Sequence, residues 1–242
     1  MKLDLAAVLR GAWALWRGER ALLLPIAGVF LVLPTVAGTV WMVPPEVADP
    51  NAPADLATLV DGMQRYMAAN LHWLLLEALV GVFGMAVILA LFLDSERPTV
   101  AGAMRIALRR FPALLLAQIA CQFAVVLGLM ALLLPGLYVL GRIFLIPAAL
   151  VAEPRRGAID GIARGIQLTA GAGFALLGLQ VPIYFASQLL IALASGFTGA
   201  GIGNPVAMMV GALIAGIGNG GMALAFALLR VTAYRQLADT RG

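Results

Sequence analysis

The chain has 242 residues, of which 62% are hydrophobic and 12% are charged. A soluble globular domain carries about 25% charged residues, so this composition, with a mean hydropathy of +0.99, excludes a soluble fold and predicts a polytopic membrane protein. The formal net charge is +4, but the basic residues are scattered between apolar stretches instead of forming one patch, and no nucleic-acid partner is expected.

The first predicted element is an amphipathic helix over residues 3–17. Its apolar face consists of Leu5, Leu9, Ala12, Trp13 and Trp16. Arg10 and Arg17 lie off that face. A basic helix with tryptophans is expected to lie in the plane of the lipid headgroups. Its charges also exclude the uninterrupted apolar core of a cleavable signal peptide.

Six apolar stretches follow that are predicted to cross a bilayer. They cover residues 21–43, 71–93, 112–134, 137–152, 174–195 and 206–229. Pro25 and Pro34 predict a bend in the first of them. Pro135-Gly136 leaves room only for a tight antiparallel hairpin between the third and fourth. The whole chain, residues 1–242, is therefore expected to be a single membrane domain.

Two further amphipathic helices are predicted in the basic segments 94–111 and 153–172, each directly before a span. Together with the first helix they suggest a weak three-fold repeat of helix plus hairpin, with Arg10, Arg105 and Arg164 at equivalent positions. The alternative is that any cytoplasmic approach to a span looks basic and amphipathic. The predicted fold class is an all-α integral membrane protein with six transmembrane helices and three cytoplasmic-side amphipathic interfacial helices.

The basic residues also predict the orientation in the membrane. The two ends of the chain and the segments 94–111 and 153–172 carry 14 of the 16 Lys and Arg residues, whereas the polar loop over residues 44–70 is acidic. By the positive-inside rule both termini are expected in the cytoplasm and the acidic loop outside.

Two charged residues fall within predicted spans, where a charge usually has a partner or a role. Glu77 and Arg142 each lie six residues from the outer end of their span, at the same expected depth. This spacing suggests an ion pair between the second and fourth spans. The alternative is that Arg142 extends to the outer headgroups while Glu77 is protonated or hydrated.

Amides are the remaining polar groups of the spans. They are Gln118, Gln122, Gln180, Gln188 and Asn219. Such amides usually hold helices together, but a central cavity lined by Gln118, Gln122, Gln180 and Asn219 would favour transport of a solute, and a dry centre would favour a scaffold. The small residues Ala212, Gly216 and Gly220 predict a close helix approach, and they would also suit an oligomer.

No catalytic motif is recognisable, so no enzymatic activity and no cofactor are expected. The single cysteine, Cys121, excludes an internal disulfide and any multi-cysteine metal site, and no metal is expected.

Several short motifs resemble a known family. The residues that carry the resemblance are Pro135-Gly136, Arg142, Pro147, Glu153, Leu168, Thr169 and Gly171. They resemble the six-span bacterial family called the glycerophosphoryl diester phosphodiesterase membrane domain, and Tyr234-Arg235 is similar to its usual ending. The resemblance implies a bacterial inner-membrane module. It does not imply the catalytic barrel to which some relatives are fused.

The leading functional hypothesis is a non-enzymatic inner-membrane protein that serves as a scaffold or accessory in envelope or lipid homeostasis. Basic residues expected near anionic headgroups are Arg10, Arg105, Arg109, Arg155 and Arg156. The expected partners are the lipid bilayer and its anionic headgroups, with a protein partner or a second copy of the chain as further candidates. The alternative hypothesis is a transporter or permease for a small or lipid-like solute.

Overall fold

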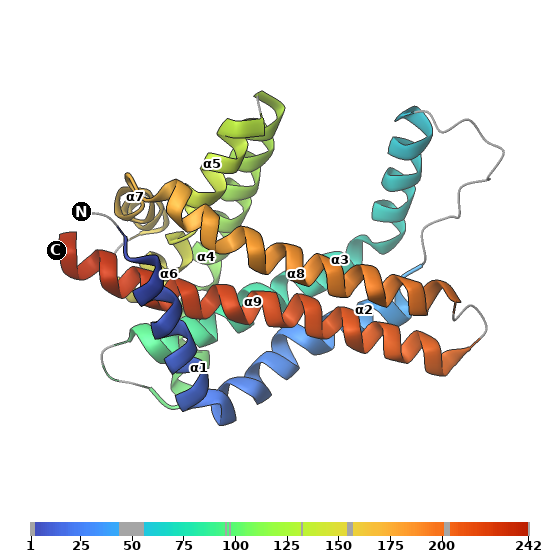
Figure 1. The fold of residues 1–242 in the computed structure, drawn as a ribbon, viewed down its shortest axis with the longest axis horizontal. Helices are drawn as coiled ribbons and strands as arrows, with labels where there is room; N and C mark the ends of the chain where they lie inside the picture. Colours follow the sequence, from blue (N-terminus) through green and yellow to red (C-terminus); the bar gives the residue numbers. More distant parts are fainter. Residues whose placement is uncertain are drawn as a thin grey trace.

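The computed structural model describes residues 3–43, 56–94, 96, 98–131, 133–153, 157–200 and 204–241. Within these residues every regular element is a helix (Figure 1). Six helical stretches are long and apolar enough to cross a membrane. The predicted all-α membrane fold with six spans is therefore confirmed.

The first amphipathic helix and the first span form one bent unit. α1 (Leu5–Ala27) begins at Asp4, whose side chain accepts a hydrogen bond from the Ala7 N–H, and it is kinked at Glu19. The span continues through the π-helical segment η1 (Gly28–Val32) into α2 (Leu33–Trp41), where Pro34 lies in the first turn. The part of α1 before the kink crosses α9 (Figure 1), and its Val8 and Ala12 are buried.

The second span is much longer than predicted, because α3 runs without a break over Leu56–Leu93. Its first turns project away from the rest of the molecule (Figure 1). The buried Asn70 side chain accepts a hydrogen bond from the Val43 N–H at 2.8 Å and donates to the Val43 carbonyl at 2.9 Å. This one amide ties the chain after α2 to α3.

The third span and its amphipathic approach are also one helix, α4 (Val100–Ala131), with Pro112 inside it. It forms a tight hairpin with α5 (Leu133–Ile143). The prediction placed the turn at Pro135-Gly136, but these residues lie in the first turns of α5. A side chain at Gly136 would come within 2.7 Å of the Leu129 backbone nitrogen, so the glycine permits the two helices to touch.

The fourth span is not continuous, contrary to the prediction for residues 137–152. α5 ends at Ile143, and α6 (Ile146–Ala152) begins after a turn at Phe144 and Leu145. Pro147 explains the break, because a proline has no N–H to continue the helix and its ring collides with the preceding turn. Phe144, Leu145 and Ile146 are fully buried, so the break lies inside the molecule.

The third amphipathic helix is α7 (Ala158–Leu168), and it packs against α6. Gly161 and Gly165 face Leu150 and Ile146. Ile159 remains 82% exposed.

The last two spans are α8 (Gly173–Ala200) and α9 (Pro205–Arg241), which lie side by side in opposite directions (Figure 1). The small residues of α9 permit the predicted close approach, but the approach is within the chain: side chains at Gly216 and Gly220 would come within 2.7 and 2.5 Å of Val36 and Val32. This ridge is therefore occupied by the first span and is not left for a second copy. The two ends of the described chain lie at the same end of the molecule (Figure 1).

Candidate functional site: a polar cavity around Arg230

A cavity of about 200 Å³ lies where the α4–α5 hairpin leaves the rest of the bundle. Its lining residues come from the described helices α3, α4, α5, α6, α8 and α9, so these six helices surround the cavity. Its polar lining consists of Gln118, Cys121, Gln122, Gln180 and Arg230, and its apolar walls include Leu114, Leu140 and Phe226. The cavity is therefore amphipathic.

Arg230 is the charged residue of this cavity. Its Nε donates a hydrogen bond to the Phe144 carbonyl at 2.9 Å, and its Nη1 contacts the Met85 sulfur. The guanidinium carbon also lies 4.9 Å from the centre of the Phe144 ring, in a cation–π contact. The broken fourth span thus presents a carbonyl and a ring to the same arginine.

Arg230 has no carboxylate partner among the described residues. In the part of the chain that the structure describes, no carboxylate oxygen lies within 4.0 Å of its nitrogens. A guanidinium has five N–H donors, of which described residues accept from two. A cation within a span normally pairs with an acid or faces a polar cavity. Arg230 lines a cavity.

Three of the four amides proposed for a central cavity do line this one. Gln118 and Gln122 come from α4 and Gln180 from α8, whose side-chain nitrogen donates to the Leu176 carbonyl at 3.2 Å. Asn219 is not among the lining residues. This cavity therefore contains three of the predicted amides, but its composition differs from the prediction by the presence of Arg230 and the absence of Asn219.

The predicted Glu77–Arg142 ion pair is not formed. Glu77 Oε1 instead accepts a hydrogen bond from the Thr35 hydroxyl at 2.5 Å. The guanidinium of Arg142 lies 6.0 Å from the centre of the Tyr138 ring. Equal depth in the membrane does not make two residues neighbours, because it does not say which helices pack together. Glu77 of α3 faces Thr35 of α2 and not Arg142 of α5.

The residues of the family resemblance meet near the break in the fourth span. Glu153 accepts hydrogen bonds from Arg164 Nε at 3.0 Å and from the Tyr234 hydroxyl at 2.9 Å. Thr169, which is fully buried, donates to the Arg142 carbonyl at 2.7 Å. These contacts join the ends of α5, α6, α7 and α9, so they position the helices that surround the cavity.

The other residues of the family resemblance have structural roles. Gly171 adopts a φ of 73°, a left-handed conformation that favours glycine, between α7 and α8. Pro147 breaks the fourth span and also lines the cavity. Leu168 is fully buried.

The arginines expected at anionic headgroups are only partly described. Arg10, Arg105 and Arg109 have exposed side chains, and Arg10 Nε donates to the Ala6 carbonyl at 3.3 Å. Arg155 and Arg156 lie outside the described residues. Contact with lipid stays a prediction for all five.

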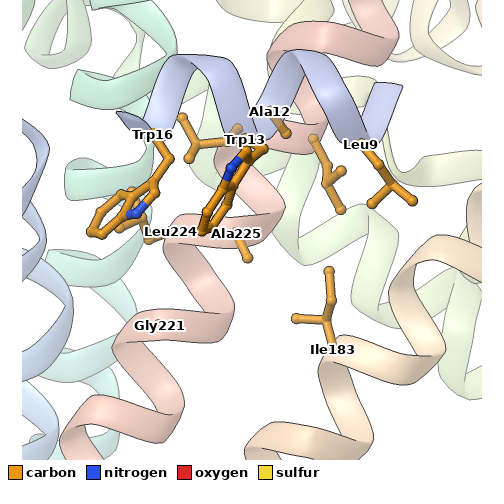
Figure 2. Close-up of a pocket in the computed structure, with 10 residues that line it drawn as sticks. Leu9, Ala12, Trp13, Trp16, Ile183, Gly221, Leu224 and Ala225 are labelled. Atoms are coloured by element: carbon orange, nitrogen blue, oxygen red, sulfur yellow. The ribbon is translucent and has the colours of Figure 1, made fainter. Parts of the chain in front are cut away.

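A second hollow, of about 350 Å³, lies under the N-terminal part of α1. Figure 2 shows Leu9, Trp13 and Trp16 reaching from α1 over this groove, with Leu224 of α9 and Ile183 of α8 as further lining residues. Arg17 lies beside it, with its guanidinium carbon 5.8 Å from the centre of the Trp13 ring. The groove is apolar, in contrast to the cavity around Arg230.

Comparisons with known protein families, curated proteins and solved structures found no match. Among the described residues there is no group of three or more His, Cys, Asp or Glu side chains that could hold a metal ion. Function is therefore inferred from the cavity itself.

Sequence reasoning missed Arg230, because the predicted sixth span ends at residue 229, directly before it. One signal could have identified it. The apolar residues Val231, Ala233 and Leu237, all buried in the structure, continue the helical pattern beyond it. An arginine followed by such a pattern lies within a packed helix and not at its end.

Proposed function

We propose that this chain is a non-enzymatic membrane protein that binds a small or lipid-like solute in the cavity around Arg230 and acts as its transporter or permease. The observation that carries the proposal is one cavity between apolar helices that holds three amides and a guanidinium, to which no carboxylate of the described residues is paired. Polar groups at such a place are unfavourable unless they are paired or bind something.

The broken fourth span supports the same proposal. Transporters frequently place their solute sites at discontinuous helices, where the irregular backbone lines a cavity. Here the turn between α5 and α6 supplies Phe144, and the first turn of α6 supplies Pro147, to the cavity wall.

A scaffold or accessory role in envelope or lipid homeostasis remains the second candidate. It is favoured by the exposed arginines of α1 and α4 and by the tryptophan-lined groove under α1. Such a protein would hold lipid at its surface and would not need the central cavity.

Native mass spectrometry of the protein, purified in mild detergent, distinguishes the two candidates. If the cavity binds a solute, the wild-type protein retains one molecule in stoichiometric amount, and Gln180→Leu loses it. Gln188→Leu is the matched control, because Gln188 lies on the same helix with an exposed side chain. Loosely held lipid in equal amounts for all three proteins would reject the cavity and favour the scaffold.

The resemblance to the glycerophosphoryl diester phosphodiesterase membrane-domain family is the basis for proposing the bacterial inner membrane as the location. The distribution of basic residues supports cytoplasmic termini. The six candidate spans of the described chain and the position of both ends at one end of the molecule support termini on the same side of the membrane (Figure 1).

A further inference from the structure

We infer that the cavity recognises a phosphate oxyanion and that Arg230 is the residue that binds it. This inference rests on the proposed function, because it names the chemical class of the solute for the same cavity. The phosphate could belong to a lipid headgroup or be free in solution, and the experiment below separates these sources.

The charge of the cavity is the first argument. The groups that contact Arg230 are the Phe144 carbonyl, the Phe144 ring and the Met85 sulfur, and all of them are neutral. No carboxylate of the described residues lies within 4.0 Å of the guanidinium. The cavity therefore has a net positive charge that an anionic ligand would neutralise.

The donors of the cavity are the second argument. The Phe144 carbonyl holds Nε in place, which fixes the plane of the guanidinium. A fixed guanidinium with unused N–H groups suits the paired oxygens of a phosphate. The amides of Gln118 and Gln122, for which no described residue is a hydrogen-bond partner, lie in the same cavity. An amide can donate to a phosphate oxygen and accept from a hydroxyl of the ligand.

Size is the third argument. Pockets for whole organic ligands measure roughly 300–1,000 Å³, whereas this cavity measures about 200 Å³. It accommodates a headgroup but not the chains of a lipid. Gln122 is exposed, so the cavity reaches the surface of the helix bundle, and the remainder of an amphiphile could stay in the surrounding lipid.

Binding to the full chain in mild detergent tests the inference with three probes. They are short-chain phosphatidylglycerol, the matched short-chain diacylglycerol without phosphate, and inorganic phosphate. We expect phosphatidylglycerol to bind with one-to-one stoichiometry and diacylglycerol to bind at least tenfold more weakly. Competition by millimolar inorganic phosphate would identify a site for free phosphate, and no competition would identify a lipid headgroup site.

The variants locate the site. We expect Arg230→Gln to weaken phosphatidylglycerol binding at least tenfold and Arg230→Lys to weaken it less, because the charge remains while the planar fork is lost. Arg65→Gln is the control, since it removes an exposed arginine of α3 outside the cavity, and its affinity should stay within twofold of wild type. If Arg230→Gln does not fold, the comparison of phosphatidylglycerol with diacylglycerol on the wild-type protein still tests whether the cavity recognises a phosphate.

Two results would overturn the inference: equal affinity of the wild-type protein for diacylglycerol and phosphatidylglycerol, or unchanged phosphatidylglycerol binding by a folded Arg230→Gln variant. The Gln180→Leu variant separates this failure from failure of the proposed function. If it loses its solute while Arg230→Gln keeps it, the cavity binds a neutral solute and only the inference fails. If neither variant changes binding, both fail.

Discussion

At the scale of single residues, side chains that are distant in the sequence donate hydrogen bonds to the backbone carbonyls at the break in the fourth span. A helix broken inside a bundle leaves backbone carbonyls that need donors, because no water is present in the bilayer core. Thr169 supplies a donor to the Arg142 carbonyl, and Arg230 supplies one to the Phe144 carbonyl. Both donors also bring their own helices to the break, so one set of contacts stabilises the fold and builds the cavity wall.

The Thr169 hydroxyl can be tested directly. Thr169→Val keeps the shape of the side chain but leaves the Arg142 carbonyl without its 2.7 Å donor, so we expect the free energy of unfolding to fall by about 1–3 kcal/mol. Thr169→Ser keeps the hydroxyl and loses one methyl group, for which about 0.8 kcal/mol is expected. Thermal or denaturant unfolding in detergent measures both. A loss for Thr169→Val that is no larger than the loss for Thr169→Ser would show that the hydrogen bond contributes no more to stability than one methyl group.

Gly141 lies where α5 and α8 come closest. A side chain there would overlap the Gly173 carbonyl oxygen, and two backbones cannot move apart as cheaply as a flexible side chain. We therefore expect Gly141→Ala to lower the free energy of unfolding by about 1–3 kcal/mol. Gly178→Ala is the matched control on α8, because nothing lies within 4 Å of its added methyl group. The greater helix propensity of alanine should stabilise that variant by up to about 1 kcal/mol, and a similar loss in both would contradict the explanation.

At the scale of elements, hydropathy and length were enough to predict all six spans, but not their ends or breaks. The spans were predicted as uninterrupted apolar stretches, and Phe144, Leu145 and Pro147 are all apolar. The predicted fourth span therefore includes the turn at Phe144 and Leu145, although Pro147 stops the helix just beyond them. The predicted sixth span ends where the first charged residue, Arg230, follows the apolar stretch, whereas α9 continues to Arg241. Residues 56–70 were predicted as part of the polar loop over residues 44–70. No proline lies between Leu56 and Leu93, and α3 runs through this segment without a break.

The joint between α6, α7 and α9 allows a test at this scale. Glu153 follows α6 and accepts hydrogen bonds from Arg164 of α7 and Tyr234 of α9. Its side chain is 21% exposed, so these bonds are partly shielded from water. We expect Glu153→Gln and Tyr234→Phe to be coupled by about 0.5–3 kcal/mol in a double-mutant cycle of unfolding free energies.

The control for this cycle pairs Glu153→Gln with Thr35→Val, since Thr35 bonds Glu77 and not Glu153. Those two effects should add within about 0.5 kcal/mol. If the Glu153 and Tyr234 effects add in the same way, the hydrogen bond does not join the helices energetically.

At the scale of the whole molecule, α9 is the centre around which the other helices are arranged. It contacts α1, η1, α2, α3, α6, α7 and α8. This arrangement explains why part of the site was predictable and part was not. Gln118, Gln122 and Gln180 could be recognised because each interrupts an apolar stretch. Their meeting with Arg230 depends on packing between residues that are 50 to 112 positions apart in the sequence.

The crossing of the membrane by the α4–α5 hairpin is the least obvious feature of this arrangement, because the hairpin projects away from α8 and α9 (Figure 1). From Pro112 to Ala131, α4 has a length of roughly 30 Å, which is enough to cross the hydrocarbon. Met130, near the tip of the hairpin, is 79% exposed. If the hairpin crosses fully, Met130 lies on the same side as Asp61 and opposite to Asp239.

Cysteine labelling of spheroplasts decides this orientation, in a Cys121→Ala background that removes the native thiol. An impermeant maleimide should label Met130→Cys and Asp61→Cys in intact spheroplasts, and Asp239→Cys only after the membrane is opened. The reverse pattern would place the termini outside and contradict the positive-inside argument. Labelling of Asp61→Cys without Met130→Cys, even after opening, would mean that the hairpin ends inside the bilayer. The cavity at its base would then be open to lipid and not to the outer solution, because the hairpin would not reach the outer surface.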